Sequence, residues 1–525
     1  MASPSILGSR RNAAQLRALA GVERELRAND SSPRRKYLRE FRSAFQSYEC
    51  VLDSQQLDQT VRAADILLVA DYHALPAAQR YAAGLLERRA QPGDRPIVLG
   101  VETIFSRHQH VLEEWWRRAI DASELRERIR FDTDWGYDWN PFYELLVTAR
   151  EHAEAVYGLD CMPRDDLRKI GARDRHAADK IAEIRQQHPN AVILVLFGES
   201  HFAPSHLPRL LAEHLPNERC LTVLQNVDAL YWSASENVQE PVDAVRVNDD
   251  VVCVFTSSPL EKYENYRLCL TRWNQQNGNY PDATPTVYNL IDSLATFLQI
   301  NRYSSHNTTQ PKFLIDKLPE VYSGSDARLA QLLLRAFRNP KKVENMLQRV
   351  DSHGSIYLPS INAFYVREFQ MIYTAEEAAR FLHHACRGLP LLRNRKLPRA
   401  SLGRKDRFYI RIAEDTLAWF GSRVLYPMRS IQGRGAVLSE AVVDRLVREA
   451  CREGRAKFDD AAQQLGYRLG DELYNAYMRG SVSPSTLRRL FLTHVDEPAR
   501  ASRLCRDILH CAASTPRKPC GSVGR

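Results

Sequence analysis

AVILVLF, at residues 191–197, is the strongest apolar run of the chain, and it leads directly into Gly198-Glu199-Ser200-His201. A short continuous apolar run that ends in polar residues is typical of a strand buried on both faces of a sheet. Five further runs of this kind lie in the first half of the chain, at residues 66–70, 96–102, 155–160, 220–224 and 251–255. These runs predict at least six strands in one sheet.

Segments with helical periodicity separate the strand runs, for example at residues 76–89 and 164–187. Strands that alternate with helices predict an α/β fold, with a mostly parallel sheet and flanking helices. We therefore expect a helical lead-in at residues 1–60 and an α/β domain at residues 61–300. Residues 301–525 have helical periodicity and few strand runs, so we expect a separate α-helical domain there.

The composition is that of an ordinary globular protein, with 44% hydrophobic and 26% charged residues in 525 positions. The formal net charge of +9 is small for this length and does not by itself indicate nucleic-acid binding. No stretch approaches the roughly 20 apolar residues of a membrane-spanning helix, and the first residues lack the apolar core of a secretion signal. The ten cysteines form no C-x-x-C pair, which favours reduced thiols. We therefore expect a cytoplasmic protein without a membrane span.

Ionisable side chains follow three of the predicted strands: Asp71 and His73, then Glu102, then His201. Ligands of such sheets bind at the carboxyl ends of the strands, so we expect these four side chains to share one rim. Two imidazoles and two carboxylates can hold a divalent metal ion. They can also act without metal, with a histidine as general base and a carboxylate that orients it. Glu199 is the weaker candidate, and we favour His201 as the functional group of its loop.

Residues 132–143 (DTDWGYDWNPFY) place two Trp, two Tyr and a Phe between predicted helices. One interpretation is a loop that caps the core. The other is an aromatic wall for a flat ligand, in which a tyrosine phenolate can serve as an iron ligand. For the second interpretation, the candidate cofactor contacts are Trp135, Tyr137 and Tyr143.

In order and strand context, these features resemble the superfamily that unites ChaN-like haem-binding proteins, Tiki-type metalloproteases and erythromycin-esterase-like enzymes. The resemblance covers residues 60–235. The matching elements are residues 70–73 (ADYH) for Gly-Glu-x-His, Glu102 for a strand-end Glu, residues 135–143 for a Trp…Tyr-x-Pro element, residues 158–164 (GLDCMPR) for Gly-Ile-Asn-x-Pro-Arg, and residues 198–201 (GESH) for Gly-x-x-His. Two positions depart from the first motif, because Ala70 replaces Gly and Asp71 replaces Glu.

The resemblance implies a protein that binds haem or iron, with a His/carboxylate pocket at the strand ends. It also implies an alternative, an esterase or peptidase-like hydrolase with His73, Glu102 and His201 as catalytic residues. In that alternative His73 or His201 would activate water, directly or through a metal ion held by Asp71, His73, Glu102 and His201. Whether the protein is an enzyme stays open at this point.

A basic run between Arg393 and Arg411 contains eight arginines and lysines against one acid, Asp406. Pro398 and Gly403 predict a loop here, which is either a solvated linker or a contact for an acidic partner. The second possibility gives a third interpretation, a non-catalytic interaction scaffold. Motifs for ATP, NAD or a serine-hydrolase elbow are absent from the sequence.

Overall fold

The computed structural model describes residues 4–29, 36–91, 93–161, 170–237, 242–274, 282–300, 317–386, 402–429, 431, 438–452, 455–495 and 499–513. The chain divides into two compact units, one of which is Glu23–Trp273. The other joins Met1–Val22 to Asn274–Arg525. Among the described residues, no helix is both long enough and apolar enough to cross a membrane.

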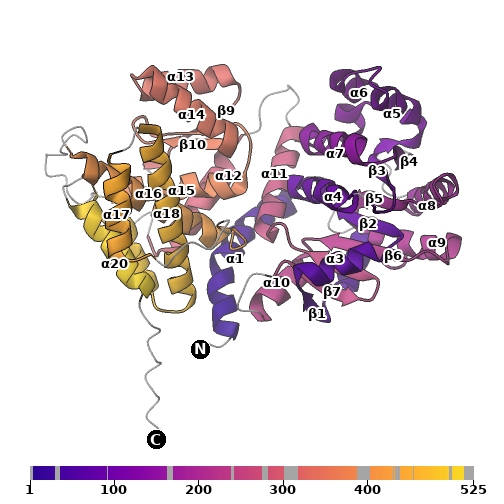
Figure 1. Cartoon of the computed structure of the whole chain (residues 1–525), viewed down its shortest axis with the longest axis horizontal. Helices are drawn as coiled ribbons and strands as arrows, with labels where there is room; N and C mark the ends of the chain where they lie inside the picture. The colour runs from indigo at the N-terminus through magenta and orange to yellow at the C-terminus, as the bar shows by residue number, and fades with distance from the viewer. Residues whose placement is uncertain are drawn as a thin grey trace, which may run out of the picture. The chain divides into compact units, whose positions relative to one another are not determined.

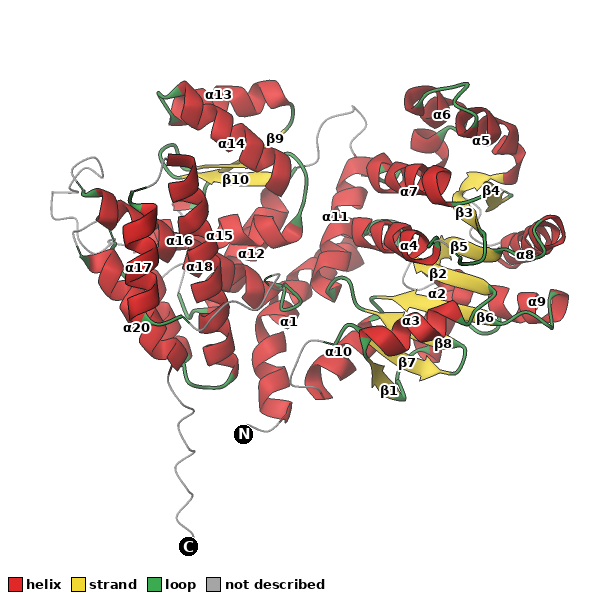
Figure 2. Cartoon of the chain, in the orientation of Figure 1, coloured by secondary structure: helices red, strands yellow, loops and turns green. Residues whose placement is uncertain are grey.

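The Glu23–Trp273 unit, hereafter the α/β unit, is built on one sheet (Figures 1 and 2). Its described strands are β1 (Cys50–Leu52), β2 (Ile66–Asp71), β3 (Ile97–Phe105), β4 (Ala155–Asp160), β5 (Val192–Gly198), β6 (Cys220–Gln225), β7 (Ala244–Asn248) and β8 (Val251–Val254). They lie in the order β1-β7-β8-β6-β2-β5-β3-β4. All pairs from β8 to β4 are parallel, whereas β7 runs antiparallel to β8 and to β1. The predicted α/β class is therefore confirmed.

Each of the six apolar runs forms a strand, namely β2, β3, β4, β5, β6 and β8. No continuous apolar run predicts β1, which is the edge strand, or β7, which lies next to it. An edge strand is covered on fewer sides, so its sequence needs no continuous apolar run. Two of the three residues of β1 are exposed, and β1 lies in the stretch expected to be a helical lead-in.

Helices cover both faces of the sheet. Alternate strand residues such as Leu67 and Leu99 share one hydrophobic core with Leu86 of α4 (Pro76–Arg89) and Leu145 of α7 (Trp139–His152). Helices α8 (Ile170–Gln187) and α9 (Leu207–His214) pack against each other and contact β4 and β6. The remaining elements of this unit include α2 (Lys36–Ala44), α3 (Ser54–Arg62), η2 (Ser106–His108), α5 (Gln109–Trp116), α6 (Ala122–Arg128), η3 (Phe131–Trp135), η5 (Glu199–Phe202), α10 (Asp228–Asn237) and α11 (Pro259–Asn274).

The second unit is mostly helical, as expected, but it also contains a small sheet of β9 (Glu320–Ser323), β10 (Ser355–Leu358) and β11 (Ala363–Val366). Each of these strands has four residues, too few for a recognisable apolar run. The described helices are α1 (Pro4–Asn29), whose first part belongs here, α12 (Thr284–Phe297), α13 (Asp326–Ala336), α14 (Pro340–His353), α15 (Met371–Cys386), α16 (Arg404–Leu425), α17 (Glu440–Ala450), α18 (Arg455–Met478), α19 (Pro484–Leu492) and α20 (Arg500–Ala513).

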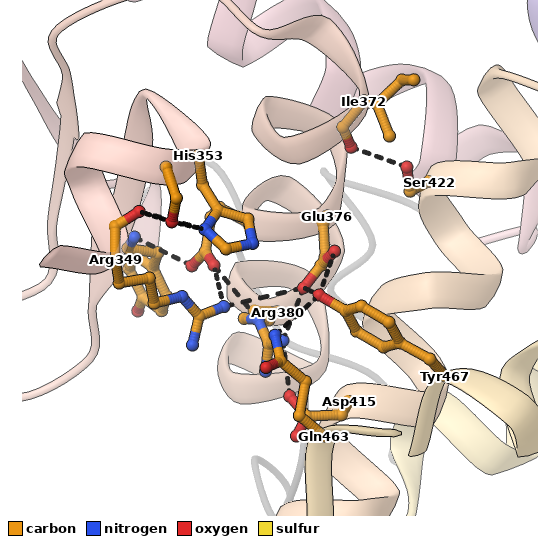
Figure 3. Close-up of polar contacts among 12 residues, drawn as sticks. Arg349, His353, Ile372, Glu376, Arg380, Asp415, Ser422, Gln463 and Tyr467 are labelled. Atoms are coloured by element: carbon orange, nitrogen blue, oxygen red, sulfur yellow. Dashed lines mark hydrogen bonds and ion pairs between the residues drawn. The ribbon is translucent and has the colours of Figure 1, made fainter. Parts of the chain in front are cut away.

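A buried ion-pair network joins the helices of this second unit (Figure 3). The Glu376 carboxylate of α15 accepts hydrogen bonds from Arg380 at 2.7 Å, from Arg429 at 2.8 Å and from the Tyr467 hydroxyl of α18 at 2.8 Å. Arg380 also pairs with Asp415 of α16. Burial would raise the pKa of Glu376, but the surrounding arginines hold it well below its usual range. The carboxylate therefore stays ionised and ties α15 to α18.

One structural expectation for the basic run was wrong. Arg404, Lys405 and Arg407 lie in helix α16 and not in a loop. The helix is set by its apolar face, because Phe408 and Ile412 are fully buried one turn apart. The first part of the run, with Arg393, lies outside the described residues.

Candidate functional site

A cavity of about 490 Å³ lies at the carboxyl ends of β2, β3 and β5 in the α/β unit. All four residues predicted to share a rim contribute to its lining: Asp71, His73, Glu102 and His201. They converge because β5 lies between β2 and β3 in the sheet, so three strand ends meet at one place.

His73 is held at the end of β2 by a neighbouring carboxylate. Its Nδ1 lies 2.8 Å from Oδ2 of Asp71, and its Nε2 lies 3.7 Å from Oε2 of Glu102. Gln79 of α4 donates a hydrogen bond to the other Asp71 oxygen. Burial raises the pKa of Asp71, an effect that His73 partly offsets. The pair fixes the orientation of the imidazole and directs Nε2 toward Glu102.

The Glu102 carboxylate is buried, and each of its two oxygens accepts a hydrogen bond. It lies in β3 where the pairing with β4 shifts register between Val101 and Phe105. One carboxylate oxygen accepts from Arg173 and the other from the Gly198 amide. Burial would raise the pKa of Glu102, but His73, Arg173 and His201 outweigh it and lower the pKa to about 2.

The guanidinium of Arg173 in α8 is the cation that contacts Glu102. It also binds Asp160 at the end of β4, with distances of 2.6 and 3.0 Å. Arg173 is only 3% exposed, so it is a structural part of the rim and not a surface charge. Arg173 was not predicted from the sequence, because α8 has the pattern of a long charged helix and no local signal marks its buried face.

His201 carries a second imidazole–carboxylate pair. Its Nδ1 hydrogen-bonds to Oδ1 of Asp174, and its Nε2 lies 3.8 Å from Oε1 of Glu102. The two histidines therefore approach the same carboxylate from two strands. Asp174 also binds His206 at 2.8 Å. Burial would raise the pKa of Asp174, but the hydrogen bonds from the two histidines lower it overall. Asp174 and His206 were also missed by the sequence analysis.

The three predicted aromatic contacts divide between the site and the core. Tyr137 lines the cavity, and its ring centroid lies 5.3 Å from that of His73. Trp135 packs directly on His73, with centroids 4.5 Å apart. Tyr143 stacks on Trp139 at 5.3 Å and does not belong to the cavity lining.

Glu199, the weaker candidate of the β5 loop, also lines the cavity. Its carboxylate accepts hydrogen bonds from the buried Lys262 at 3.2 and 3.3 Å. Lys262 lies in addition over the Tyr72 ring, 4.5 Å from its centroid. Lys262 thus balances the charge of Glu199 within the cavity wall, whereas His201 faces Glu102.

The described residues offer no arrangement of three or more His, Cys, Asp or Glu side chains that could hold a metal ion. The reason lies at Glu102, where a guanidinium and a backbone amide already take both oxygens. The cavity fits an organic ligand better, since its volume falls within the range of about 300–1,000 Å³ that is usual for such ligands. Its lining is mixed and combines the polar rim with the apolar side chains of Leu38, Phe41 and Phe45.

A match to one protein-family model supports the resemblance drawn from the motifs. No curated protein matches the chain. A solved structure titled "Cofacial heme binding to ChaN of Campylobacter jejuni" is similar, with 14% identity over 33% of this chain and 86% of that chain and a TM-score of 0.25. Residues 57–193, which carry β2, β3, β4 and α4 to α8 of the α/β unit, match the family described as haem-binding uptake, Tiki superfamily, ChaN.

Proposed function

We propose that the α/β unit binds haem, with the cavity at the ends of β2, β3 and β5 as its site. The observation that carries the proposal is the position of His73, which lines this cavity beside Tyr137 within the segment that matches the haem-binding family. Imidazole nitrogen and tyrosine oxygen are both common axial ligands of haem iron. The chain therefore supplies two candidate iron ligands on one wall.

The contacts of His73 suit an iron ligand. Asp71 accepts a hydrogen bond from Nδ1–H, so the neutral form of the imidazole carries its lone pair on Nε2. The Trp135 ring restricts rotation of the imidazole. When bound, haem supplies a metal centre to which such a nitrogen or the Tyr137 oxygen can bind. The apolar side chains of α2 would cover a flat ring, and the guanidiniums of Arg27 and Arg42, which also line the cavity, would pair with its carboxylates.

Titration of the purified protein with haemin tests this proposal. We expect a shifted Soret band in the wild type and at least about tenfold weaker binding in His73→Ala or Tyr137→Phe. Tyr143→Phe is the matched control, because Tyr143 lies in the same aromatic segment but outside the cavity lining. An absent Soret shift, or one that His73→Ala and Tyr137→Phe leave unchanged, contradicts haem binding here.

A second candidate, a hydrolase, is favoured by the pairing of His73 with Asp71. An imidazole oriented by a carboxylate can take a proton from water, as in other His/carboxylate sites. Glu102, with a pKa of about 2, would stay ionised and orient the imidazoles, so we assign proton transfer to His73 or His201 and not to Glu102. Since Arg173 and the Gly198 amide already occupy both oxygens of Glu102, we expect such activity to survive chelators.

Panels of ester and peptide substrates, with His73→Ala and His201→Ala, distinguish this candidate. Activity that is lost in the variants and retained in EDTA supports it, and inactivity of the wild type on both panels removes it. The scaffold interpretation depends on the basic run, whose first part lies outside the described residues, and it stays a prediction. So does the cytoplasmic location.

A further inference from the structure

Helix α2 covers the cavity and carries a charged residue on a different side. Tyr37, Leu38 and Phe41 belong to the cavity lining, and the helix packs on η5, which contains His201. Glu40 lies on the same helix and points to His206, with Oε2 3.1 Å from Nε2. The apolar residues of α2 therefore face the ligand space, while Glu40 ties the helix to the segment before α9.

His206 lies between two carboxylates. Its Nδ1 is 2.8 Å from Oδ2 of Asp174, and its Nε2 is 3.1 Å from Oε2 of Glu40. A carboxylate accepts hydrogen bonds and cannot donate them, so both ring nitrogens must carry hydrogen to satisfy both partners. The observed arrangement thus requires the imidazolium form of His206.

We propose that His206 is a pH-dependent latch that holds α2 over the cavity. In the charged form His206 bridges Asp174 to Glu40 and keeps the helix closed. Loss of one proton removes one of the two hydrogen bonds. The bond to Glu40 breaks, because the Glu40 side chain is 37% exposed and water can replace the imidazole, whereas Asp174 is 1% exposed and has no such substitute.

The charged neighbours of Glu40 and Asp174 agree with loss of the Glu40 bond first. Lys36 lies 3.5 Å from Glu40 on the same helix, so it offers the released carboxylate a partner that leaves with α2. Asp174 keeps its second hydrogen bond, to His201, and stays in the rim. Of these hydrogen bonds, only the one between Glu40 of α2 and His206 is lost.

The direction of the pH effect follows from the pKa of His206. The hydrogen bond to Asp174 raises this pKa above its ordinary value of about 6.5, burial opposes the rise, and Glu40 adds to it. A raised pKa means that the stabilisation is fully present below about pH 6.5 and is lost as pH rises through the higher value of the folded protein. The latch is therefore closed in weak acid and open at alkaline pH.

Hydrogen exchange of the α2 amides, at residues 36–44, tests the latch without any ligand. Rates are converted to protection factors at each pH, which removes the intrinsic pH dependence of exchange. We expect protection of α2 in the wild type to fall by about tenfold across the titration of His206, as for one lost charged hydrogen bond. Failure of haem binding would not affect this measurement, since the proposed latch needs only the cavity and its covering helix.

Two variants and one control separate the latch from a general structural effect. His206→Gln and Glu40→Gln should each give low, pH-independent protection of α2. Glu40 lies on the surface of the helix, so its variant keeps the test valid if His206→Gln does not fold. His214→Gln is the control, because His214 is an exposed histidine of α9 that pairs with Asp179 at 3.5 Å. A wild-type pH profile in Glu40→Gln, or protection of α2 that does not change with pH in the wild type, overturns the proposal.

Discussion

Nδ1 of His73 lies 2.8 Å from Oδ2 of Asp71, two residues earlier at the end of β2. The Asp71 carboxylate is buried and receives a second hydrogen bond from Gln79, so it cannot rotate away. A carboxylate held in this way fixes the orientation of the imidazole and the position of its second nitrogen. The shorter Asp71, which replaces the Glu of the family motif, still reaches His73.

Asp71→Asn should weaken haemin binding by about 10–100-fold, because an amide orients the imidazole less strongly than a carboxylate. Soret titration measures the affinity, and circular dichroism checks the fold. Asp58→Asn is the control, since Asp58 pairs with Arg62 at 2.7 Å on the surface of α3. Equal affinities for Asp71→Asn and the wild type would show that His73 does not depend on this carboxylate.

Gly198→Ala should disturb the site more than the fold. An added Cβ would lie 3.1 Å from Oε2 of Glu102 and 3.1 Å from Nε2 of His73, so both side chains must shift. We expect haemin affinity to fall at least about tenfold. Gly84→Ala in α4 is the control, because there the nearest atom is the mobile end of Arg88 at 3.4 Å. That control should stabilise the helix by about 0.5–1 kcal/mol, and unchanged affinity in Gly198→Ala would contradict the packing at this rim.

Glu102→Gln should remove part of the acid sensitivity of the α/β unit. Glu102 has its pKa lowered to about 2, so its stabilisation is present above about pH 4.5 and is lost as pH falls toward 2. Loss of the buried pair with Arg173 should cost about 3 kcal/mol at neutral pH, the lower end for such pairs, because Asp160 still binds Arg173. Urea unfolding between pH 3 and 7 measures both effects. Glu113→Gln, at an exposed ion pair with Arg117, should keep the wild-type pH dependence.

Glu376→Gln should destabilise the second unit without changing the ligand site. It removes the charge that Arg380 and Arg429 bind in the interior, which costs about 3–5 kcal/mol for a buried pair. Denaturant unfolding followed by tryptophan fluorescence measures the loss. Haemin titration of the folded variant should match the wild type, and weaker binding would show that the network in Figure 3 acts on the ligand site.

Most strands of the sheet could be predicted from the sequence. So could four side chains that line the cavity at the strand ends. Asp71, His73, Glu102 and His201 each follow an apolar run, and parallel strands bring their carboxyl ends to one edge. The aromatic segment was harder to interpret. Its sequence does not tell Tyr137, which lines the cavity, from Tyr143, which stacks in the core. The difference is one of position in the fold, because Tyr137 precedes α7 and packs on His73, whereas Tyr143 lies within that helix.

The sequence by itself determined the α/β class, because apolar runs of five to seven residues can satisfy burial on both faces only inside a covered sheet. It also determined which residues stand at the strand ends. Only the tertiary structure decided which other side chains complete the site. Arg173 and Asp174 are adjacent on a charged helix, and their burial against Glu102 and His201 depends on how α8 docks on the sheet. Pairs such as Glu40 with His206 join residues 166 positions apart, and no local pattern encodes such a contact.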